Sequence, residues 1–143
     1  MAKVSVIVTT YNRKEYLTET LNSILNQTFN DFELIVIDNY SNYDFLSHIE
    51  SFNDSRIRPF QNQNNGVISV NRNFGIKKSE CEFIAFCDDD DIWIDTKLEI
   101  QLNKIIETKA ELVCSNLSIF EGDKNNILIK TENRKIKNIY DLI

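Results

Sequence analysis

Short apolar runs typical of buried strands alternate along this chain with segments in which apolar residues recur at helical spacing. The run KVSVIVTT at residues 3–10 comes first, and leucines three or four residues apart follow it. The expected strands are 3–10, 32–38, 56–60, 82–87 and 110–120. Two expected helices begin after Asn12 and after Thr96, and three more cover 43–52, 67–78 and 134–143. Residues 125–130 are expected to pair with another strand. This alternation predicts an α/β fold, an open and mostly parallel sheet with helices on both faces.

Local signals predict where several of these elements begin. Asn12 with Glu15 forms one capping pair, and Thr96 with Glu99 forms another. Pro59 places its strand near an edge of the sheet, because proline cannot donate a ladder hydrogen bond.

The helix expected at 67–78 carries its apolar residues on one side. Val67, Val70 and Phe74 are spaced so that they share a face. We expect this face to pack against the sheet.

Charge and hydropathy exclude some classes of function. The net charge is −6, and the sequence has no block of Lys and Arg that would make a nucleic-acid groove. Its apolar runs are shorter than a membrane span, and the first one lacks the cleavage site of a signal peptide. We expect a cytoplasmic protein without a nucleic-acid partner.

Polar clusters stand where three of the expected strands end. They are residues 9–13 (TTYNR), Asp38 with Asn39, and the run Asp88–Asp91. Because ligands of open α/β sheets bind beyond the carboxyl ends of the strands, these clusters predict one site at that edge.

The run of four aspartates indicates what this site holds. The sequence has only three glycines and lacks the glycine-rich motifs that surround a phosphate with backbone N–H groups. Carboxylates suit Mg²⁺ or Mn²⁺, which commonly bind through one or two carboxylates together with substrate phosphates. The sequence therefore predicts a divalent cation that in turn holds a diphosphate.

Two stretches of the sequence resemble a known family. VSVIVTTYNRKEYLTETLNSILNQTFNDFELIVIDN looks like the opening of the inverting glycosyltransferases of family 2, which have the Rossmann-like GT-A fold. NRNFGIKKSECEFIAFCDDDDIW is similar to the Arg-Asn-x-Gly helix, strand and Asp-x-Asp motif of that family. The resemblance covers residues 3–120.

The resemblance implies which residues hold the nucleotide. Thr9 and Tyr11 follow the first strand, where the family holds the nucleotide, with Tyr11 stacking near the base and Arg13 beside them. Asp38 matches the aspartate that contacts the base, typically uracil, and Arg72 matches the arginine near the nucleotide or the diphosphate.

The resemblance also assigns the aspartates. Asp88 and Asp90 align with the Asp-x-Asp pair and are the expected metal ligands, with Asp90 as the direct ligand. Asp89 or Asp88 would contact the ribose or the waters of the metal, and Asp91 has no assigned role.

Structural explanations compete with these assignments. Asn12 could simply cap a helix, Arg13 and Arg72 could be solvated surface residues, and Asp38 could be a turn residue. The aspartate run could be an acidic loop before a helix, and Trp93 could only pack beneath it.

The sequence departs from the family at two points. Tyr40 stands where the family usually has glycine. The second departure concerns the catalytic base: the acidic residues after 120 match no base motif, so we expect the base beyond residue 143 and interpret 1–143 as a single donor-binding domain that stops before the acceptor-binding half.

The expected function is therefore transfer of a sugar from a nucleotide-sugar, UDP-linked, to a hydroxyl of a glycan or lipid-linked acceptor. Work at the inner face of the plasma membrane, as a peripheral protein, would fit such an acceptor. A non-catalytic nucleotide-binding module or a partner subunit with the same fold is the main alternative. A nucleotidyltransferase is disfavoured because TTYNRKEYL contains no glycine.

Overall fold

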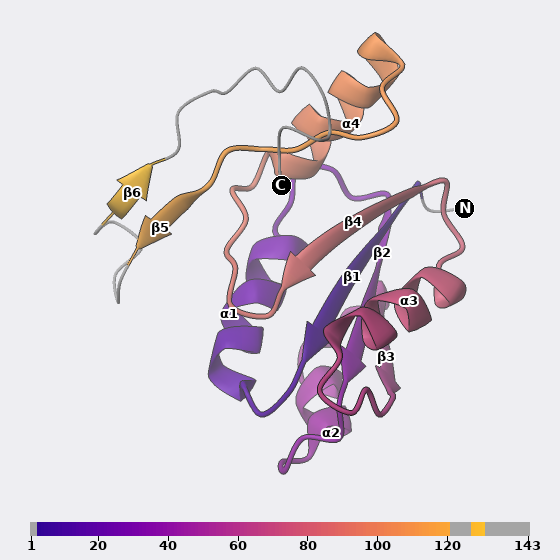
Figure 1. Cartoon of the computed structure of the whole chain (residues 1–143), viewed down its shortest axis with the longest axis vertical. Helices are drawn as coiled ribbons and strands as arrows, with labels where there is room; N and C mark the ends of the chain where they lie inside the picture. Colours follow the sequence, from indigo (N-terminus) through magenta and orange to yellow (C-terminus); the bar gives the residue numbers. More distant parts are fainter. Residues whose placement is uncertain (1–2, 121–126, 131–143) are drawn as a thin grey trace. The chain divides into compact units, whose positions relative to one another are not determined.

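The computed structural model describes residues 3–120 and 127–130 (Figure 1). The strands are β1 (Val4–Thr10), β2 (Phe32–Asp38), β3 (Ile57–Gln61), β4 (Phe83–Asp88), β5 (Ser118–Phe120) and β6 (Ile127–Lys130), and the helices are α1 (Lys14–Leu25), α2 (Phe45–Glu50), α3 (Ile68–Lys78) and α4 (Lys97–Thr108). The chain divides into two compact units, residues 1–100 and 101–143.

The first unit is built on a parallel sheet of four strands in the order β3-β2-β1-β4. The prediction of a mostly parallel sheet is confirmed, and β3 with its Pro59 lies at an edge, as expected. The chain enters at a central strand, and every residue of β1 and β2 is buried.

Burial of β2 on both faces requires helices on both faces, because successive side chains of a strand point to opposite sides. On one face α3 packs over β1 and β2, where Ile7 and Ile37 form part of a cluster. Gly75 permits this close approach, since a Cβ there would lie 2.6 Å from Cγ2 of Ile7. The other face is covered by α1, with α2 beside it (Figure 1), and Oγ1 of Thr18 lies 2.9 Å from Nε2 of His48.

The predicted face of α3 was wrong for two of its three residues. Val67 and Val70 are exposed, and the buried residues of this helix are Asn71 and Gly75. Phe74 is half-buried against Phe60, with ring centroids 5.7 Å apart. The helix therefore approaches the sheet through Gly75 and Asn71, with Phe74 beside them.

β4 has an open face. Ile84 and Phe86 point to the same side as Ile7 but remain exposed, because α3 packs over β1 and β2. Asp88 continues this row, and its side chain is half exposed. The open face of β4 therefore leaves the first aspartate of the run accessible.

The second unit differs from the sequence prediction. Residues 110–117 lack regular structure, and only Ser118–Phe120 of the predicted strand 110–120 forms β5. The segment expected to pair at 125–130 does so as β6, antiparallel to β5. Ser115 and Asn116 interrupt the apolar run, whereas a strand in the middle of a parallel sheet is typically apolar throughout.

The remaining prediction for this part, a helix at 134–143, lies outside the described residues. Within the described part of the chain, the helices are too short or too polar to cross a membrane.

Candidate functional site

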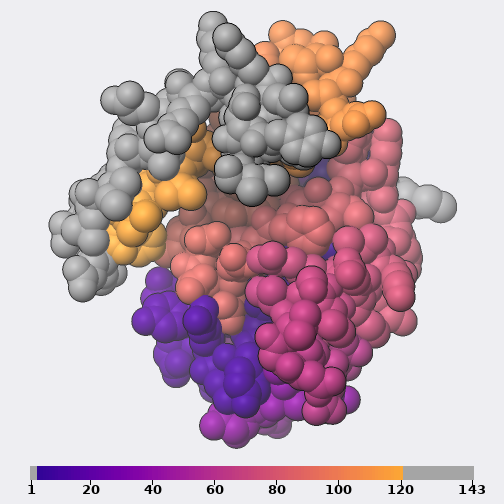
Figure 2. All heavy atoms as spheres, in the orientation of Figure 1, coloured from indigo at the N-terminus to yellow at the C-terminus, as the bar shows by residue number. Residues whose placement is uncertain are grey.

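Strand register brings the three predicted clusters to one edge of the sheet. Thr9 lies opposite Asp88 in β4, and Thr10 lies opposite Asp38 in β2. Figure 2 shows the segments after β1 (indigo), around α3 (magenta) and after β4 (salmon) adjoining on one face of this unit. Residues almost eighty positions apart in the sequence are thus in contact, as in the pair Thr10 and Asp89.

The aspartate run divides between the two faces of the sheet. Asp88 points to the α3 side, where Nη2 of Arg72 donates to its Oδ1 at 2.5 Å. Asp89 points to the other side, where Oγ1 of Thr10 donates to it at 2.7 Å. Arg72 thus contacts the run, and the side chain of Asp89 is almost fully buried.

Arg13 bridges the second and third aspartates. One nitrogen, Nη1, donates to Oδ1 of Asp89 at 3.1 Å and to Oδ2 of Asp90 at 2.7 Å. The negative charges of Asp89 and Asp90 raise the pKa of the Arg13 guanidinium. Arg13 therefore neutralises part of the run.

Asp91 closes the run as a tight turn. Its backbone N–H donates to the carbonyl of Asp88 at 3.2 Å, and its own carbonyl accepts from Oγ1 of Thr20 at 2.9 Å. Burial, followed by the charges of Asp88 and Asp90, raises the pKa of the Asp91 carboxyl.

Gln27, for which no role was predicted, anchors the segment that follows the aspartate run. It is buried; its Nε2 donates to the carbonyl of Ile94 at 2.7 Å, and its Oε1 accepts from the backbone N–H of Leu98 at 2.9 Å. Trp93 is buried as well, and its backbone N–H donates to Oγ of Ser23. The signal for Gln27 was the sequence LNQT at residues 25–28, because the family that this chain resembles usually has Leu-x-Gln-Thr at the end of this helix.

The carboxylate of Asp38 is buried at the end of β2. It accepts from the backbone N–H of Ser41 at 3.0 Å, from Oγ of Ser41 at 2.5 Å and from Nε2 of Gln61 at 3.1 Å. Between Asp38 and Ser41 the backbone of Tyr40 is left-handed, with φ of 58°. The family's usual glycine at this position is explained by that conformation, which glycine adopts without steric cost.

Asn12 ties two loops together, and its prediction as a helix cap was wrong. Arg13 holds the cap position of α1, while Asn12 has φ of 54°. The backbone N–H of Asn12 donates to Oγ of Ser41 at 2.8 Å, and Oδ1 of Asn12 accepts from the backbone N–H of Asn42 at 2.7 Å. The loops after β1 and β2 are therefore joined, with Tyr11 and Tyr40 exposed on them at 54% and 59%.

A further polar residue at this edge was missed. Asn71 of α3 is fully buried, and its Oδ1 accepts from Nδ2 of Asn62 at 2.8 Å. Its own Nδ2 has no partner among the described residues. Apolar periodicity could not reveal it, because a buried asparagine does not stand out in a helix.

The donor chemistry of the run fits Mg²⁺ or Mn²⁺, because carboxylate oxygens are hard ligands and one or two of them are enough beside substrate phosphates. Among the described residues, however, no three acidic, His or Cys side chains are grouped as a ready-made metal site. Asp88 and Asp90, the predicted ligands, are each held by an arginine.

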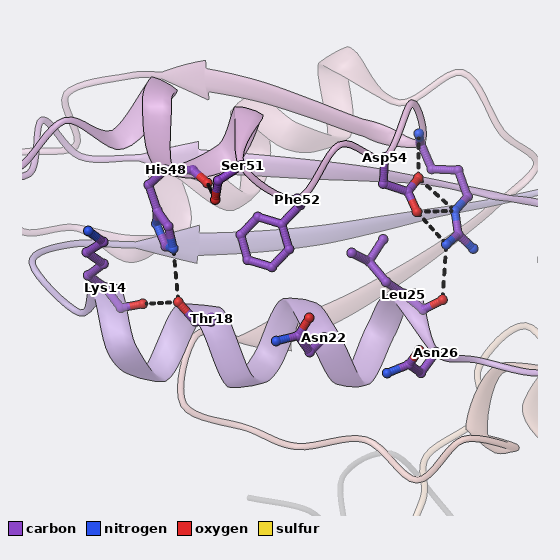
Figure 3. A pocket seen from close by; sticks show the side chains of 10 residues that line it. Lys14, Thr18, Asn22, Leu25, Asn26, His48, Ser51, Phe52 and Asp54 are labelled. Atoms are coloured by element: carbon purple, nitrogen blue, oxygen red, sulfur yellow. Dashed lines mark hydrogen bonds and ion pairs between the residues drawn. The ribbon is translucent and has the colours of Figure 1, made fainter.

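A separate hollow of about 710 Å³ lies between α1 and α2 (Figure 3). Thr18, His48 and Phe52 line it together with Asp54 and Arg56, which are paired at 2.7 Å. Burial lowers the pKa of His48. None of the residues predicted to bind the nucleotide or the metal lines this hollow.

Comparison with known proteins places the chain among glycosyltransferases. The model of the family described as "Glycosyl transferase family 2" matches residues 5–141. A curated relative from Escherichia coli, UDP-Glc:alpha-D-GlcNAc-diphosphoundecaprenol beta-1,3-glucosyltransferase WfgD, is 32% identical over 142 residues, which cover 94% of this chain and 55% of the relative.

A second relative is poly(ribitol-phosphate) beta-N-acetylglucosaminyltransferase TarP of Staphylococcus aureus. It is 37% identical over 131 residues, 89% of this chain and 40% of that protein. The crystal structure of S. aureus TarS 1-349 in complex with UDP matches with a TM-score of 0.68 and 37% identity, over 73% of this chain and 32% of that one. This chain thus spans about half, or less, of the length of these proteins.

Proposed function

This chain belongs to glycosyl transferase family 2, and we propose that it carries the donor site of a metal-dependent transferase that uses a nucleotide-sugar. The proposed donor is UDP-linked, and the proposed acceptor is a hydroxyl of a glycan or of a lipid-linked saccharide. The observation that carries this proposal is the run Asp88–Asp91, which meets Arg13 and Arg72 at the carboxyl edge of the sheet.

The base and ribose fit the side of the site formed by the loops after β1 and β2. Tyr11 presents an exposed ring on which a base can stack. Asp38 is fully buried and accepts hydrogen bonds from Ser41 and Gln61, so contact between its remaining lone pair and the N–H of a pyrimidine would require the loop after β2 to move. Thr9 of β1 lies opposite Asp88 of β4, where a ribose would connect the base to the diphosphate.

The diphosphate and the metal fit the other side, at the aspartates. Asp88 and Asp90 would hold Mg²⁺ or Mn²⁺, which when bound neutralises charge on the diphosphate leaving group. Arg13 and Arg72 supply cationic N–H donors suited to phosphate oxygens. Asp89 accepts from Thr10 and from Arg13 and would position Arg13 beside this ligand.

The reaction proposed for the whole protein is a single displacement. The acceptor oxygen attacks the anomeric carbon from the side opposite the diphosphate, the bond from that carbon to the diphosphate oxygen breaks, and the configuration inverts. A carboxylate base takes the proton of the acceptor hydroxyl. We expect this base outside the described residues.

Similar proteins support the choice of donor and acceptor. The name of the E. coli relative gives a UDP-glucose donor and a diphosphoundecaprenol-linked acceptor, and TarS binds UDP and UDP-GlcNAc. A lipid-linked acceptor would place the protein at the periphery of a membrane.

Calorimetric titration of UDP in the presence of Mn²⁺, and again with EDTA, tests the donor site. We expect binding that depends on Mn²⁺ and that weakens at least about tenfold in Asp90→Asn, which keeps the size of the side chain but removes its charge. Asp31→Asn is the matched control, since Asp31 is exposed and its described bond uses only the backbone.

Two results would count against the proposal. If UDP bound equally well with EDTA, the proposed metal dependence would be wrong. If the folded chain bound neither UDP nor GDP, the proposed donor site would be wrong. UDP binding by a longer protein that never turns over a UDP-sugar would favour the non-catalytic module instead.

A further inference from the structure

Arg13 occupies the place at the aspartate run where a cation is expected. Its Nη1 lies 2.7 Å from Oδ2 of Asp90 and 3.1 Å from Oδ1 of Asp89. The guanidinium is therefore directly bonded to Asp90, the carboxylate that the family resemblance assigns to the metal.

The two carboxylates that share Arg13 differ in how firmly they are held. Asp89 is buried and also accepts from Thr10, whereas the side chain of Asp90 is 48% exposed and its described bond is the one to Arg13. The Arg13 side chain is itself 50% exposed. Of the two contacts, the one between Arg13 and Asp90 is the one that can exchange partners without opening the fold.

Arg13 and a metal ion at Asp90 would compete for this carboxylate. A divalent ion bonded to this carboxylate would lie within a few ångströms of the guanidinium, where two positive charges repel each other strongly. Asp88, the other predicted ligand, is bonded to Arg72, so neither predicted metal ligand is free of an arginine.

We propose that Arg13 is a resident counter-ion that a divalent metal must displace from Asp90, so that Arg13 weakens metal binding by the free protein. This inference rests on the donor site proposed above. The displaced guanidinium is then available to the diphosphate. The metal and the nucleotide therefore bind cooperatively, because the metal frees Arg13 to bind the diphosphate and the diphosphate keeps Arg13 away from Asp90. Arg13 acts here as a positioning residue that couples the two ligands.

The direct test measures Mn²⁺ affinity by the electron paramagnetic resonance signal of free Mn²⁺, without nucleotide. Arg13→Gln removes the competing charge, and we expect it to bind Mn²⁺ roughly tenfold more tightly than the natural chain. Lys14→Gln removes the same charge from the next residue, whose Nζ lies over the ring of Tyr43, and should change the affinity by less than about twofold. With saturating Mn²⁺, Arg13→Gln should bind UDP roughly tenfold more weakly.

Equal or weaker Mn²⁺ binding by a folded Arg13→Gln variant would overturn the inference while leaving the donor site intact, provided the natural chain binds UDP with Mn²⁺. If no variant and not even the natural chain binds Mn²⁺ in the presence of UDP, the donor site itself fails, and the inference fails with it.

A measurement on the natural chain covers the case in which the variant does not fold. The side-chain Nε–H resonance of Arg13 should shift on titration with Mg²⁺, and the shift should follow saturation of the metal site. A resonance that stays in place while Mg²⁺ saturates the chain would overturn the inference.

Discussion

At the scale of single residues, several polar side chains of the site organise its loops. Asp89 is the clearest case, because it joins Thr10 at the end of β1 to Arg13 at the start of α1. The family resemblance singles out Asp89 as a site residue but does not say to which face of the sheet its side chain points. That face follows from the register of β4, because successive side chains alternate between the two faces. Asn12 was misassigned because its hydrogen-bond partners, Ser41 and Asn42, lie about thirty residues away in the sequence and no local pattern indicates them.

Replacing Asp89 should therefore cost stability. Asp89→Asn weakens two hydrogen bonds to a buried carboxylate, and we expect the free energy of unfolding to fall by about 2 kcal/mol. Asp90→Asn, at a half-exposed position with the same arginine partner, should cost less than about 1 kcal/mol. Urea unfolding followed by circular dichroism measures both; equal losses would mean that Asp89 does not organise the loop.

At the scale of elements, a second polar cluster fastens the opposite end of the sheet. Glu33 of β2 accepts from Oγ of Ser5 in β1 at 2.5 Å and from the backbone N–H of Glu80 at 2.8 Å, and Arg58 of β3 pairs with it. Burial alone would raise the pKa of Glu33, but these hydrogen bonds and the charge of Arg58 together lower it.

A lowered pKa in the folded state makes a definite prediction for the dependence of stability on pH. The contribution of Glu33 should be complete above its ordinary pKa of 4.5 and should be lost as the pH falls through the lower folded value. The difference in unfolding free energy between the natural chain and Glu33→Gln should therefore shrink between about pH 6 and pH 3. Glu82→Gln, at an exposed position, is the control. If the difference in unfolding free energy between the natural chain and Glu33→Gln grew on acidification, the stabilising role of the cluster around Glu33 would be contradicted.

Elements were predicted best where apolar residues carry the signal. β1 and β2 agree closely with the sequence, because buried parallel strands need apolar runs, and β3 and β4 begin and end within one residue of their predicted bounds. The orientation of α3 was not predictable in this way, since Gly75 rather than a large side chain meets the sheet. The run at 110–120 contains enough apolar residues to suggest a strand, but it lies in the second unit and only Ser118–Phe120 forms β5.

At the scale of the whole molecule, the site is assembled from segments that follow three strands of the first unit. Sequence reasoning could predict this convergence, because a parallel sheet brings the carboxyl ends of its strands to one edge. It could not predict that Arg13 and Arg72 pair with the aspartates, since these contacts join residues 77 and 16 positions apart. Such pairs depend on loop geometry and not on periodicity.

The most direct test of the donor site is the position of a bound metal. Crystals of the chain grown with UDP and Mn²⁺, measured with X-rays at the manganese absorption edge, should show an anomalous peak within about 2.5 Å of a carboxylate oxygen of Asp90 and beside the diphosphate. The guanidinium of Arg13 should then have left Asp90. UDP bound at this edge without a peak near Asp88 or Asp90, or a peak elsewhere in the chain, would contradict a metal-dependent donor site built on the aspartate run.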